Sequence, residues 1–545
     1  MNRRPARRFT IEPLEGRALL AAASLPTVSV ADAAMFEGAD GTANLVFTVA
    51  LSAPARRQTV VPFRTVDGTA TVADSDYVAT SGSVTFRVGQ RMATITVPVR
   101  GDLTVEADET LQVVLGTPTN ATLDRATATG AIRNDDQPTA ELPGPPATGS
   151  WTVLVYMTGE NLNDYAAEDI NEMEKALTTL PGSVRIVVSW DQPKASVDVA
   201  YATGNNAQPA WRSYGRSVLA ADATMSTIAS SFDLSFGERN TGDPATLVDF
   251  VTWGVQRAPA ENYLLQLWGH GGGLDGSQFD SESGDDALTI AELGTALATP
   301  GMPAIGLVSF DNCLMAMAEV AAAIAPSVSG VFVASEELVN GPGQNYVTAY
   351  SALAVADPAA VTAAQVAAGM VASYGVQYRN DRGRMDTFSA VSTAGQAALH
   401  AALRQFVEAT ATLNSAQRTT VRTAARASIA YDTSSFRDLG SFMGRVAAVT
   451  TLPATVRSAA AGVTAAVSAA VVAKTADQRG SAGVAIYLPL TSDGYLASYA
   501  RDAQVFTQAT GWDQFARWLA TGARSSAGMS SGAGRGTARG GARWA

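Results

Sequence analysis

The 545-residue sequence is poor in the side chains that most often perform nucleophilic and acid–base chemistry. It contains a single cysteine, Cys313, and two histidines, His270 and His400. One cysteine excludes a disulfide within the chain. This does not exclude export, because an exported bacterial protein can keep one thiol for chemistry and gain rigidity from bound calcium.

Positive charge is missing from a long central stretch. No Lys or Arg occurs between Arg257 and Arg379. The same interval contains the acidic residues Glu261, Asp275, Asp280, Glu282, Asp285, Asp286, Glu292, Asp311, Glu319, Glu336, Glu337 and Asp357. The resulting negative potential attracts cationic side chains, and a buried carboxylate can bind Arg through a charge-assisted pair. The net charge of −12 argues against a nucleic-acid partner, because phosphate contacts need clustered Lys and Arg.

No transmembrane segment is predicted. The Ala-rich stretch 459–473 is too short and too rich in small side chains to span a bilayer, and it favours a buried helix. The hydrophobic content of 47% supports a sizeable core. Because single cores rarely exceed about 250–300 residues, a chain of this length should form more than one domain.

Two short stretches place the cysteine and one histidine in similar positions. Residues 264–273 and 307–315 each have the pattern of a buried strand, and these strands end near His270 and Cys313. In parallel sheets covered on both faces, ligands gather beyond the carboxyl ends of the strands. The apolar spacing from Leu314 to Ile324 predicts a helix that begins at or just after Cys313, with a dipole that would favour the thiolate.

These residues have the chemistry of a nucleophile and its base. A thiol beside a neutral imidazole can attack a carbonyl group. Glycines after His270 leave room for a substrate backbone, and the N–H groups of Gly271 and Cys313 are candidates for an oxyanion hole. The alternative is structural, because a lone cysteine is usually a small buried hydrophobe. His400 lies in a helix-like stretch, where a structural role is expected.

The sequence around this pair resembles the clostripain family of cysteine peptidases, in the caspase-like clan. That family has a strand followed by His-Gly, here His270-Gly271, and a strand followed by Asp-x-Cys, here Asp311-Asn312-Cys313. The resemblance covers residues 151–520 through ordered matches at 151–157, 161–174, 334–337, 341–343, 483–489 and 510–512. With the strand–helix alternation, it implies an α/β caspase-like domain with a mostly parallel sheet. It implies an endopeptidase acting on polypeptides, and no organic cofactor is expected.

The resemblance also implies a specificity. In this family the Asp of Asp-x-Cys, here Asp311, helps to form the pocket for the basic residue that precedes the cut. Glu336 and Glu337 follow the next strand and are candidates for a second acidic pocket residue by position alone. The alternative role for Asp311 is a helix N-cap, and the two roles are compatible.

Residues 27–136 have a different pattern. Short Val/Thr-rich segments at 44–49, 60–65, 83–86 and 93–97 predict an antiparallel β-sandwich. The segments 64–70, 76–77 and 106–111 resemble a Calx-β domain, in which carboxylates hold calcium at one end of the sandwich. The resemblance implies Ca²⁺ ligands among Glu37, Asp76, Asp102, Glu106, Asp135 and Asp136. Gly101 stands where the family often has another Asp, and the alternative is that these acids are solvated loop ends.

The remaining segments predict an exported protein. Residues 1–24 combine a basic start with a short apolar run and resemble a secretory signal, the alternative being a disordered basic tail. Residues 137–150 have the composition of a Pro/Gly linker, and 521–545 that of a disordered Gly/Ser/Arg tail. We therefore expect a protein that is secreted or held at the surface of a bacterium.

Two other functions are compatible with the same residues. One is an inactive peptidase relative that serves calcium-dependent adhesion at a cell surface. The other is a cysteine hydrolase or transferase that acts on non-peptide amides. If the chain is a peptidase that cuts itself after basic residues, the cut cannot lie between His270 and Cys313, where no Lys or Arg occurs. Candidate positions are Arg212, Arg216, Arg239 and Arg257, or sites that release the sandwich or the tail.

Overall fold

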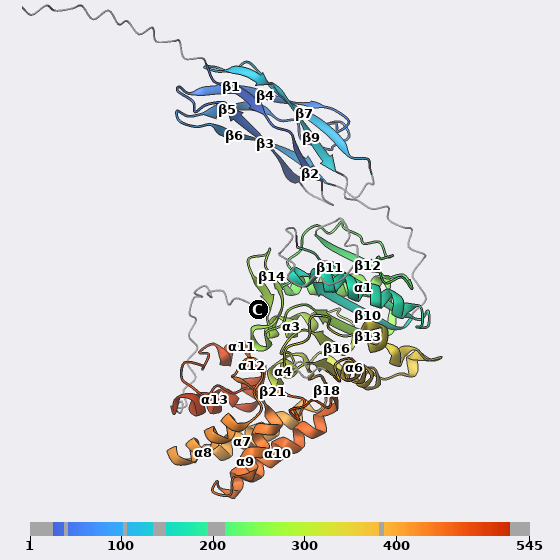
Figure 1. Ribbon diagram of the computed structural model, residues 1–545, viewed down its shortest axis with the longest axis vertical. Coiled ribbons are helices and arrows are strands. Elements are labelled where there is room, and N and C mark those ends of the chain that lie inside the picture. Colours follow the sequence, from blue (N-terminus) through green and yellow to red (C-terminus); the bar gives the residue numbers. More distant parts are fainter. Residues whose placement is uncertain are drawn as a thin grey trace, which may run out of the picture. The chain divides into compact units, whose positions relative to one another are not determined.

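The structure is a computed structural model that describes residues 25–37, 42–101, 106–133, 149–193, 213–380 and 386–523. The chain divides into two compact units, Met1–Pro138 and Thr139–Ala545, and each is described by itself (Figure 1). The predicted leader 1–24 and most of the predicted linker and tail lie outside the described residues. Within the described ranges, no helix is both long and apolar enough to cross a membrane.

The first unit is a β-sandwich. One sheet has the strand order β6-β3-β1-β8 and the other β2-β9-β7-β4-β5. Alternate residues of β3, such as Leu45, Phe47 and Val49, are buried in the core of the sandwich. The strands are β1 (Thr27–Val30), β2 (Ala33–Phe36), β3 (Thr42–Leu51), β4 (Thr59–Asp67), β5 (Ser81–Phe86), β6 (Met92–Arg100), β7 (Glu109–Leu115), β8 (Thr122–Arg125) and β9 (Thr127–Arg133).

The sandwich is not purely antiparallel, contrary to the expectation from the sequence. The N-terminal segment leaves one sheet after Val30 and joins the other at Ala33. Its two halves pair in parallel with β8 and β9, at one edge of each sheet. Because short segments of this kind carry no signal for their direction of pairing, the parallel edges were not predictable from the pattern.

The second unit is built on an eight-stranded sheet in the order β12-β11-β10-β13-β16-β17-β18-β20. Its central strands β11, β10, β13, β16 and β17 pair in parallel, which confirms the predicted mostly parallel sheet. Antiparallel strands complete both edges. The strands are β10 (Gly149–Thr158), β11 (Val184–Asp191), β12 (Tyr214–Val218), β13 (Ala260–Trp268), β16 (Ile305–Asp311), β17 (Val328–Ala334), β18 (Ser389–Ser392) and β20 (Val471–Lys474).

Helices cover both faces of this sheet, and this explains why its strands lack polar alternation. In β10, Val153 and Val155 belong to a core shared with α1 (Asn163–Leu177), α5 (Tyr346–Ala349) and α6 (Ala363–Gln377). Leu154 and Tyr156 belong to the opposite core, which includes α2 (Pro244–Arg257), α3 (Ile290–Leu297) and α4 (Ala318–Ile324).

A group of C-terminal helices extends the second of these cores. In Figure 1, α7, α8, α9 and α10 lie together below β18 and β21. The Ala-rich stretch 459–473 forms most of α10 as predicted, but β-branched Val471 and Val472 begin β20 instead of continuing the helix. The elements are α7 (Gln396–Thr410), α8 (Ser415–Ala427), α9 (Leu439–Ala448), α10 (Ala454–Ala470), α11 (Tyr499–Asp502), α12 (Gln504–Thr510), α13 (Trp512–Thr521) and the paired strands β19 (Phe436–Asp438) and β21 (Ala485–Tyr487).

Candidate active site

His270 and Cys313 follow neighbouring strands of the central sheet. β13 and β16 are parallel, with Trp268 paired to Asp311, so the two strands end at the same edge. Both side chains line one cavity of about 320 Å³. Its other walls include Asn161 and Tyr165, which follow β10, and residues 338–343, which follow β17. The cavity therefore lies beyond the carboxyl ends of four adjacent parallel strands, β10, β13, β16 and β17.

His270 is held by a partner from a distant part of the sequence. Its Nε2 lies 2.5 Å from Oδ1 of Asn161, in the short 3-10 helix Glu160–Leu162 that follows β10. With the amide oxygen as acceptor, Nε2 carries the proton and Nδ1 remains as the basic nitrogen. Burial lowers the pKa of His270. The imidazole is thus poised in its neutral form, which can accept a proton.

Cys313 does not lie at a helix N-terminus, and this part of the sequence prediction is wrong. Helix α4 begins only at Ala318. Leu314 has a φ of 65°, which is incompatible with a right-handed α-helix at this residue. The intervening segment instead pairs with residues after β17, through Leu314 N–H to Glu337 O (3.0 Å) and Ala316 N–H to Ser335 O (2.9 Å). Tertiary hydrogen bonds have overridden the helical spacing of the apolar side chains.

The environment of Cys313 favours the thiol over the thiolate. Burial raises its pKa, a hydrogen bond donated by Val339 N–H to Sγ (3.3 Å) lowers it, and the nearby carboxylates of Asp311, Asp432 and Glu337 raise it further. No helix dipole offsets the burial, because α4 starts too far along the chain. Cys313 therefore needs a base to remove its proton, and His270 lines the same cavity.

Gly271 packs directly against the backbone of Cys313. A Cβ atom on Gly271 would lie 2.5 Å from Cys313 O and 3.0 Å from Cys313 N, so only glycine allows this approach. Among the described residues, neither the N–H of Gly271 nor that of Cys313 donates a hydrogen bond. The backbones of Gly271 and Cys313 thus approach each other closely, and both N–H groups are left for another acceptor.

Asp311 is a buried carboxylate in the cavity wall. Its Oδ2 accepts hydrogen bonds from Gln344 N–H (2.9 Å) and from the hydroxyl of Tyr346 (2.7 Å). Its Oδ1 is buried and has no hydrogen-bond partner among the described residues. Burial raises the pKa of Asp311 to about 6. The alternative that Asp311 caps a helix is wrong, because the N-cap of α4 is Met317.

Glu336 and Glu337 lie outside the lining of this cavity. Glu336 accepts hydrogen bonds from Tyr431 (2.7 Å) and from Gly483 N–H (3.1 Å). Glu337 forms an ion pair with Arg479 (2.8 Å). Both carboxylates therefore point into the packing between β17 and the C-terminal helical region, and neither is available as a second pocket acid. His400, on α7, packs edge-on against Phe506 and also lies outside the lining.

Comparison with known proteins places this geometry in a family. Residues 155–518, most of the chain, match the family model described as "Clostripain family". The chain belongs to the clostripain family of cysteine peptidases. In addition, residues 24–136 match the model described as "Calx-beta domain".

Individual relatives of this clostripain-family chain are distant. Clostripain of Hathewaya histolytica is 32% identical over 127 residues, which are 20% of this chain and only 24% of that protein. The structure of a secreted C11 cysteine protease from Bacteroides thetaiotaomicron with an irreversible peptide inhibitor covers 67% of this chain and 99% of its own, with 20% identity and a TM-score of 0.50. At that identity the likeness concerns the fold. The apo-form Calx CBD1 domain covers 21% of this chain and 100% of its own, at 22% identity and a TM-score of 0.18.

The clostripain-like domain contains two acids near the cavity that the sequence analysis missed, the buried Asp169 and the half-buried Glu172. Asp169 on α1 accepts a hydrogen bond from Nε1 of Trp268 (2.6 Å), a residue that lines the cavity. Glu172, one turn further, accepts one from Tyr346 N–H (2.7 Å). Burial raises the pKa of Glu172 to about 7. The only sequence signal for these residues was two acids on the apolar face of a predicted helix, a pattern that does not name a partner.

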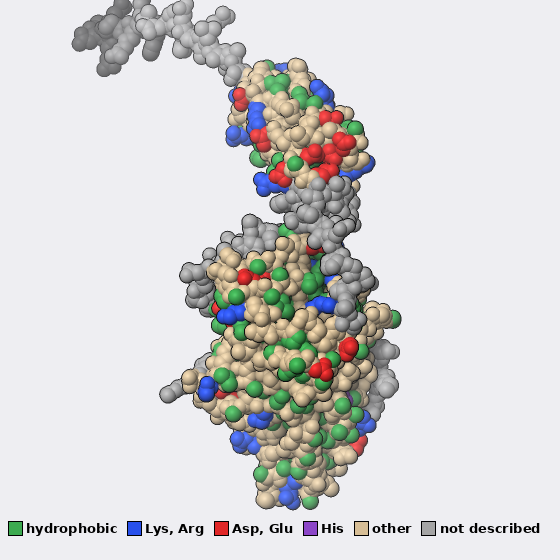
Figure 2. Space-filling model, turned by 90° about the vertical axis from the view of Figure 1, so that its right-hand side faces the viewer, with side chains coloured by type: hydrophobic (Ala, Val, Ile, Leu, Met, Phe, Trp, Pro, Cys, Tyr) green, Lys and Arg blue, Asp and Glu red, His purple; other side chains and the backbone are tan. Residues whose placement is uncertain are grey.

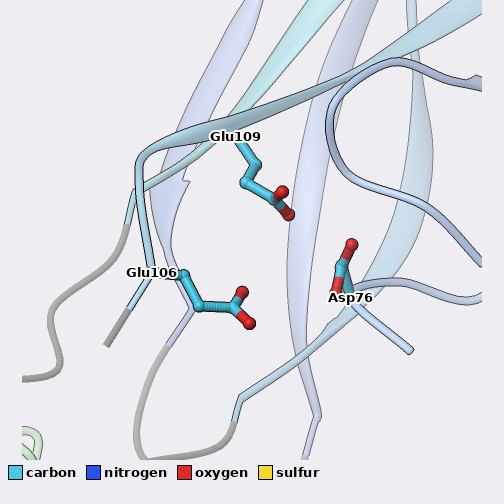
Figure 3. A group of neighbouring side chains, drawn as sticks. All are labelled: Asp76, Glu106 and Glu109. Atoms are coloured by element: carbon cyan, nitrogen blue, oxygen red, sulfur yellow. The ribbon is translucent and has the colours of Figure 1, made fainter. Parts of the chain in front are cut away.

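The Calx-β-like sandwich contains an acidic cluster of its own. Asp76, Glu106 and Glu109 each place a carboxylate oxygen within 4.8 Å of the others, and Figure 3 shows the side chains converging. Burial, a hydrogen bond to Asp76 and the nearby acids raise the pKa of Glu109 to about 7. The oxygen-only donor set fits Ca²⁺. Glu109 was not predicted, because it begins β7 and has the position of a strand residue.

The other predicted calcium ligands are not placed in this cluster. Glu37 is buried at the end of β2. Asp102, Asp135 and Asp136 lie outside the described residues, so these assignments remain predictions. On the face of the sandwich shown in Figure 2, acidic side chains gather toward one end of the unit.

Proposed function

We propose that this chain is an active endopeptidase that cleaves polypeptides after Arg or Lys. The proposal rests on the environment of Asp311, which is a buried carboxylate in the cavity wall. Its Oδ1 has no hydrogen-bond partner among the described residues. An unpaired buried carboxylate is costly, and a cationic side chain that enters the cavity removes the cost by a charge-assisted pair.

The walls of the cavity support the same specificity. Burial and the charge of Asp311 raise the pKa of Asp169 and of Glu172, and a cation in the cavity would offset the repulsion among these three carboxylates. Gly343 has a φ of 59°, and a Cβ atom there would lie 2.6 Å from Asp311 Oδ2. The backbone at Gly343 thus closes over one side of Asp311, and the unpaired Oδ1 is the oxygen left for a ligand.

The proposed mechanism uses the groups that meet at the strand ends. Sγ of Cys313 attacks the scissile carbonyl carbon while His270 takes the thiol proton. The N–H groups of Gly271 and Cys313 stabilise the oxyanion of the tetrahedral intermediate. The C–N bond then breaks, and the imidazolium of His270 protonates the leaving amine. A water molecule then gives a proton to His270 and attacks the thioester carbonyl. The C–S bond breaks, the acid product leaves, and His270 returns the proton to Sγ of Cys313.

Fluorogenic peptides that end in Arg, Lys or Ala test the proposal against its two rivals. We expect turnover of the Arg or Lys peptide by the wild type and none by Cys313→Ala. Folded wild type that turns over no peptide would support the adhesion hypothesis. Turnover of simple amides but not of peptides would support the non-peptide hydrolase, and equal turnover of the Ala peptide would contradict basic specificity.

Self-cleavage, if it occurs, is proposed at Arg239. Arg216 is buried in β12 and its guanidinium pairs with Asp249 (2.6 Å), so a protease cannot reach it. Arg257 lies at the end of α2 against Trp253, and Arg212 lies outside the described residues. Arg239 is exposed in a loop between β12 and α2, and cleavage requires such an accessible segment. Sequencing new termini in wild type and Cys313→Ala checks this, and a cut within 271–312 would contradict it.

Calcium binding by the sandwich and export of the protein complete the proposal. Asp76, Glu106 and Glu109 would hold the ion, which would tie the turn before β7 to the loop after β4. Isothermal titration of the Cys313→Ala protein with Ca²⁺, beside a variant with Asp76→Asn and Glu109→Gln, tests the site. Unchanged binding in the variant would contradict it. Export, to the medium or to a cell surface, is tested by fractionating cells that express the full chain.

A further inference from the structure

A second cavity lies among helices of the peptidase unit and shares no lining residue with the candidate active site. Its volume is about 370 Å³, and α3, α4 and α12 border it. Both α3 and α12 pack against α4 (Figure 1). The rim is open to solvent, since Val505 of α12 is 49% exposed. None of the lining residues takes part in the proposed peptide cleavage, so the cavity is free to bind another ligand.

Short side chains on the facing helices create this space. Ala291, Gly294 and Ala298 follow one another on one face of α3, at the spacing of three and four that a helix gives. On α4, Ala323 lies one turn after Glu319 and borders the same cavity. A Cβ atom on Gly294 would lie 2.7 Å from Ala323 O, so the two helices approach each other closely there. A hollow with short apolar walls remains beside this contact.

Glu319 places a buried carboxylate in the wall of the hollow. The residue is only 1% exposed, and its Oε1 accepts hydrogen bonds from Tyr487 N–H (3.0 Å) and from the hydroxyl of Tyr499 (2.7 Å). Its Oε2 is buried and has no hydrogen-bond partner among the described residues. Burial raises the pKa of Glu319 to about 7, because a charge without a partner is costly in this environment. A cation against Oε2 would remove this cost.

The other groups around the cavity also favour positive charge. Among the described residues that line it there is a second acid, Asp502, and there is no Lys, Arg or His. Asp502 pairs with its neighbour Arg501 (2.9 Å), so Glu319 is the stronger attraction. The last turns of α3 and α4 border the cavity at Thr295 and Ala323, and the C-terminal end of a helix carries partial negative charge. A ligand with a positive head and a short apolar body matches both the acid and the walls.

We propose that this cavity binds a small organic cation, an alkylammonium or alkylguanidinium ion, with its charged head on Oε2 of Glu319. The head forms a charge-assisted hydrogen bond with the carboxylate, and the alkyl chain is buried against Ala298, Ala323 and Val505. A bare metal ion fits less well, because Ca²⁺ takes about 6–8 oxygen ligands and most of the lining side chains are apolar. Such a charged head occurs on free amines and on the Lys or Arg side chains of polypeptides.

Isothermal titration tests the site in the full chain. The parent protein carries Cys313→Ala, to prevent self-cleavage, and Asp311→Asn, which removes the unpaired carboxylate of the active-site cavity. The probes are n-butylammonium and n-butylguanidinium, with n-butanol as the neutral control. We expect saturable binding of the cations with one site per chain, and binding of n-butanol that is at least about tenfold weaker.

A short peptide with one Lys between blocked Ala residues separates the two sources of the charged head. Binding at least as tight as that of n-butylammonium would assign the cavity to a polypeptide side chain. Weaker binding of the peptide would assign it to a free amine. In either case the ligand has the proposed chemistry.

Variants of the cavity then decide the matter. Glu319→Gln should weaken binding of the cations at least about tenfold. Ala298→Phe keeps the carboxylate but fills the hollow from the exposed end of α3, and it should abolish binding. Glu261→Gln is the matched control, because it removes an exposed acid of β13 that does not line the cavity, and it should leave binding unchanged.

Three results would overturn the proposal. They are a folded parent protein that binds neither cation, equal affinity in either folded cavity variant, and binding of n-butanol as tight as that of the cations. Because the parent protein lacks the nucleophile, the outcome is independent of whether the chain is an active peptidase.

Discussion

The sandwich and the peptidase unit both gather acids near strand ends, but they do so at very different depths. Glu106 of the sandwich cluster is exposed, Glu109 is half-buried at the start of β7, and Asp76 lies in the loop between β4 and β5. In the peptidase unit, Asp311, Asp191 and Asp280 are buried among strands of the sheet or hydrogen-bonded to its loops. Water screens the first group, whereas each charge of the second raises the free energy of the folded state unless a partner offsets it.

This difference in burial predicts how strongly each site responds to the loss or gain of a single atom. A surface cluster can lose one oxygen and replace it with water, so its function degrades gradually. A buried site is close-packed, and neither an added methyl group nor a lost charge can be compensated by the solvent. Changes in the peptidase unit should therefore have large effects, and equivalent changes in the sandwich small ones.

The largest effect is expected for Gly271→Ala. The added Cβ would overlap Cys313 O at 2.5 Å and displace both candidate oxyanion donors. Loss of such donors costs about 100- to 1,000-fold in kcat, and the overlap adds to this. Gly182→Ala is the matched control, because no atom lies within 4 Å of its new Cβ. Steady-state kinetics with an Arg peptide checks both, and an active Gly271→Ala enzyme would exclude this oxyanion hole.

Asp311→Asn should come next. It removes a buried charge while keeping acceptors for Gln344 and Tyr346. Loss of one member of a buried charge pair costs about 2–5 kcal/mol, so kcat/KM for Arg peptides should fall by about 30- to 5,000-fold. Peptides with a neutral residue before the cut serve as the control and should be affected far less. An equal loss for both peptides would assign Asp311 a structural role.

A stability effect of the order of 3 kcal/mol is expected for Glu319→Gln. Glu319 is buried on α4, where it accepts hydrogen bonds from Tyr487 N–H and Tyr499, and burial raises its pKa to about 7. An acid whose pKa is raised in the folded state is protonated there first, so stability falls as pH rises from about 4.5 to about 7. The variant should therefore be more stable than wild type at pH 8 and not at pH 4. Urea unfolding at both values checks this, and identical pH dependence would contradict it.

The pH dependence of activity should show a smaller, substrate-dependent effect. Because the pKa of Asp311 is raised to about 6, the carboxylate is charged above this value and neutral below it. Below pH 6, kcat/KM for Arg peptides should therefore fall toward about tenfold per pH unit. This acidic fall in kcat/KM should be absent in Asp311→Asn, which distinguishes titration of Asp311 from protonation of His270. If kcat/KM falls in the same way below pH 6 in wild type and variant, a group other than Asp311 causes the fall.

The smallest effect is expected for the sandwich. Glu106→Gln removes an exposed carboxylate from the cluster and should weaken Ca²⁺ binding without changing peptide turnover. The thermal transition of the sandwich in calcium should fall by a few degrees, as for a loss of about 1 kcal/mol. Differential scanning calorimetry with and without chelator checks this. A large loss of peptidase activity in this variant would contradict the expectation that changes in the sandwich have only small effects.

The placement of His270 and Cys313 at one edge of the sheet could be predicted from local patterns. The strands before His270 and Cys313 are apolar without alternation, and such strands are parallel and end at a common edge. The partners of these residues could not be predicted in this way. Asn161 lies 109 residues before His270, and Asp169 lies 99 residues before Trp268, so only the folded sheet and α1 bring them together.

Two errors have the same physical origin. The helical spacing after Cys313 is genuine, but hydrogen bonds from Leu314 and Ala316 to the segment after β17 hold this stretch in a turn and delay the helix until Ala318. Glu336 and Glu337 follow a strand end, but their side chains pair with Tyr431 and Arg479 from the C-terminal region. In both cases a long-range contact outweighed a local preference worth less than about 1 kcal/mol per residue.

The sequence by itself determined that the chain combines a β-sandwich with an α/β unit, that its single cysteine and His270 follow apolar strands, and that the region around them is acidic. These follow from residue type and periodicity, which are local properties. The tertiary structure decided which carboxylates face the cavity, that Asn161 orients His270, that Cys313 lacks a helix dipole, and that Glu319 lies in the wall of a second cavity. Those features depend on which surfaces become buried against each other, and burial is what sets the cost, the pKa and the required partner of every charge.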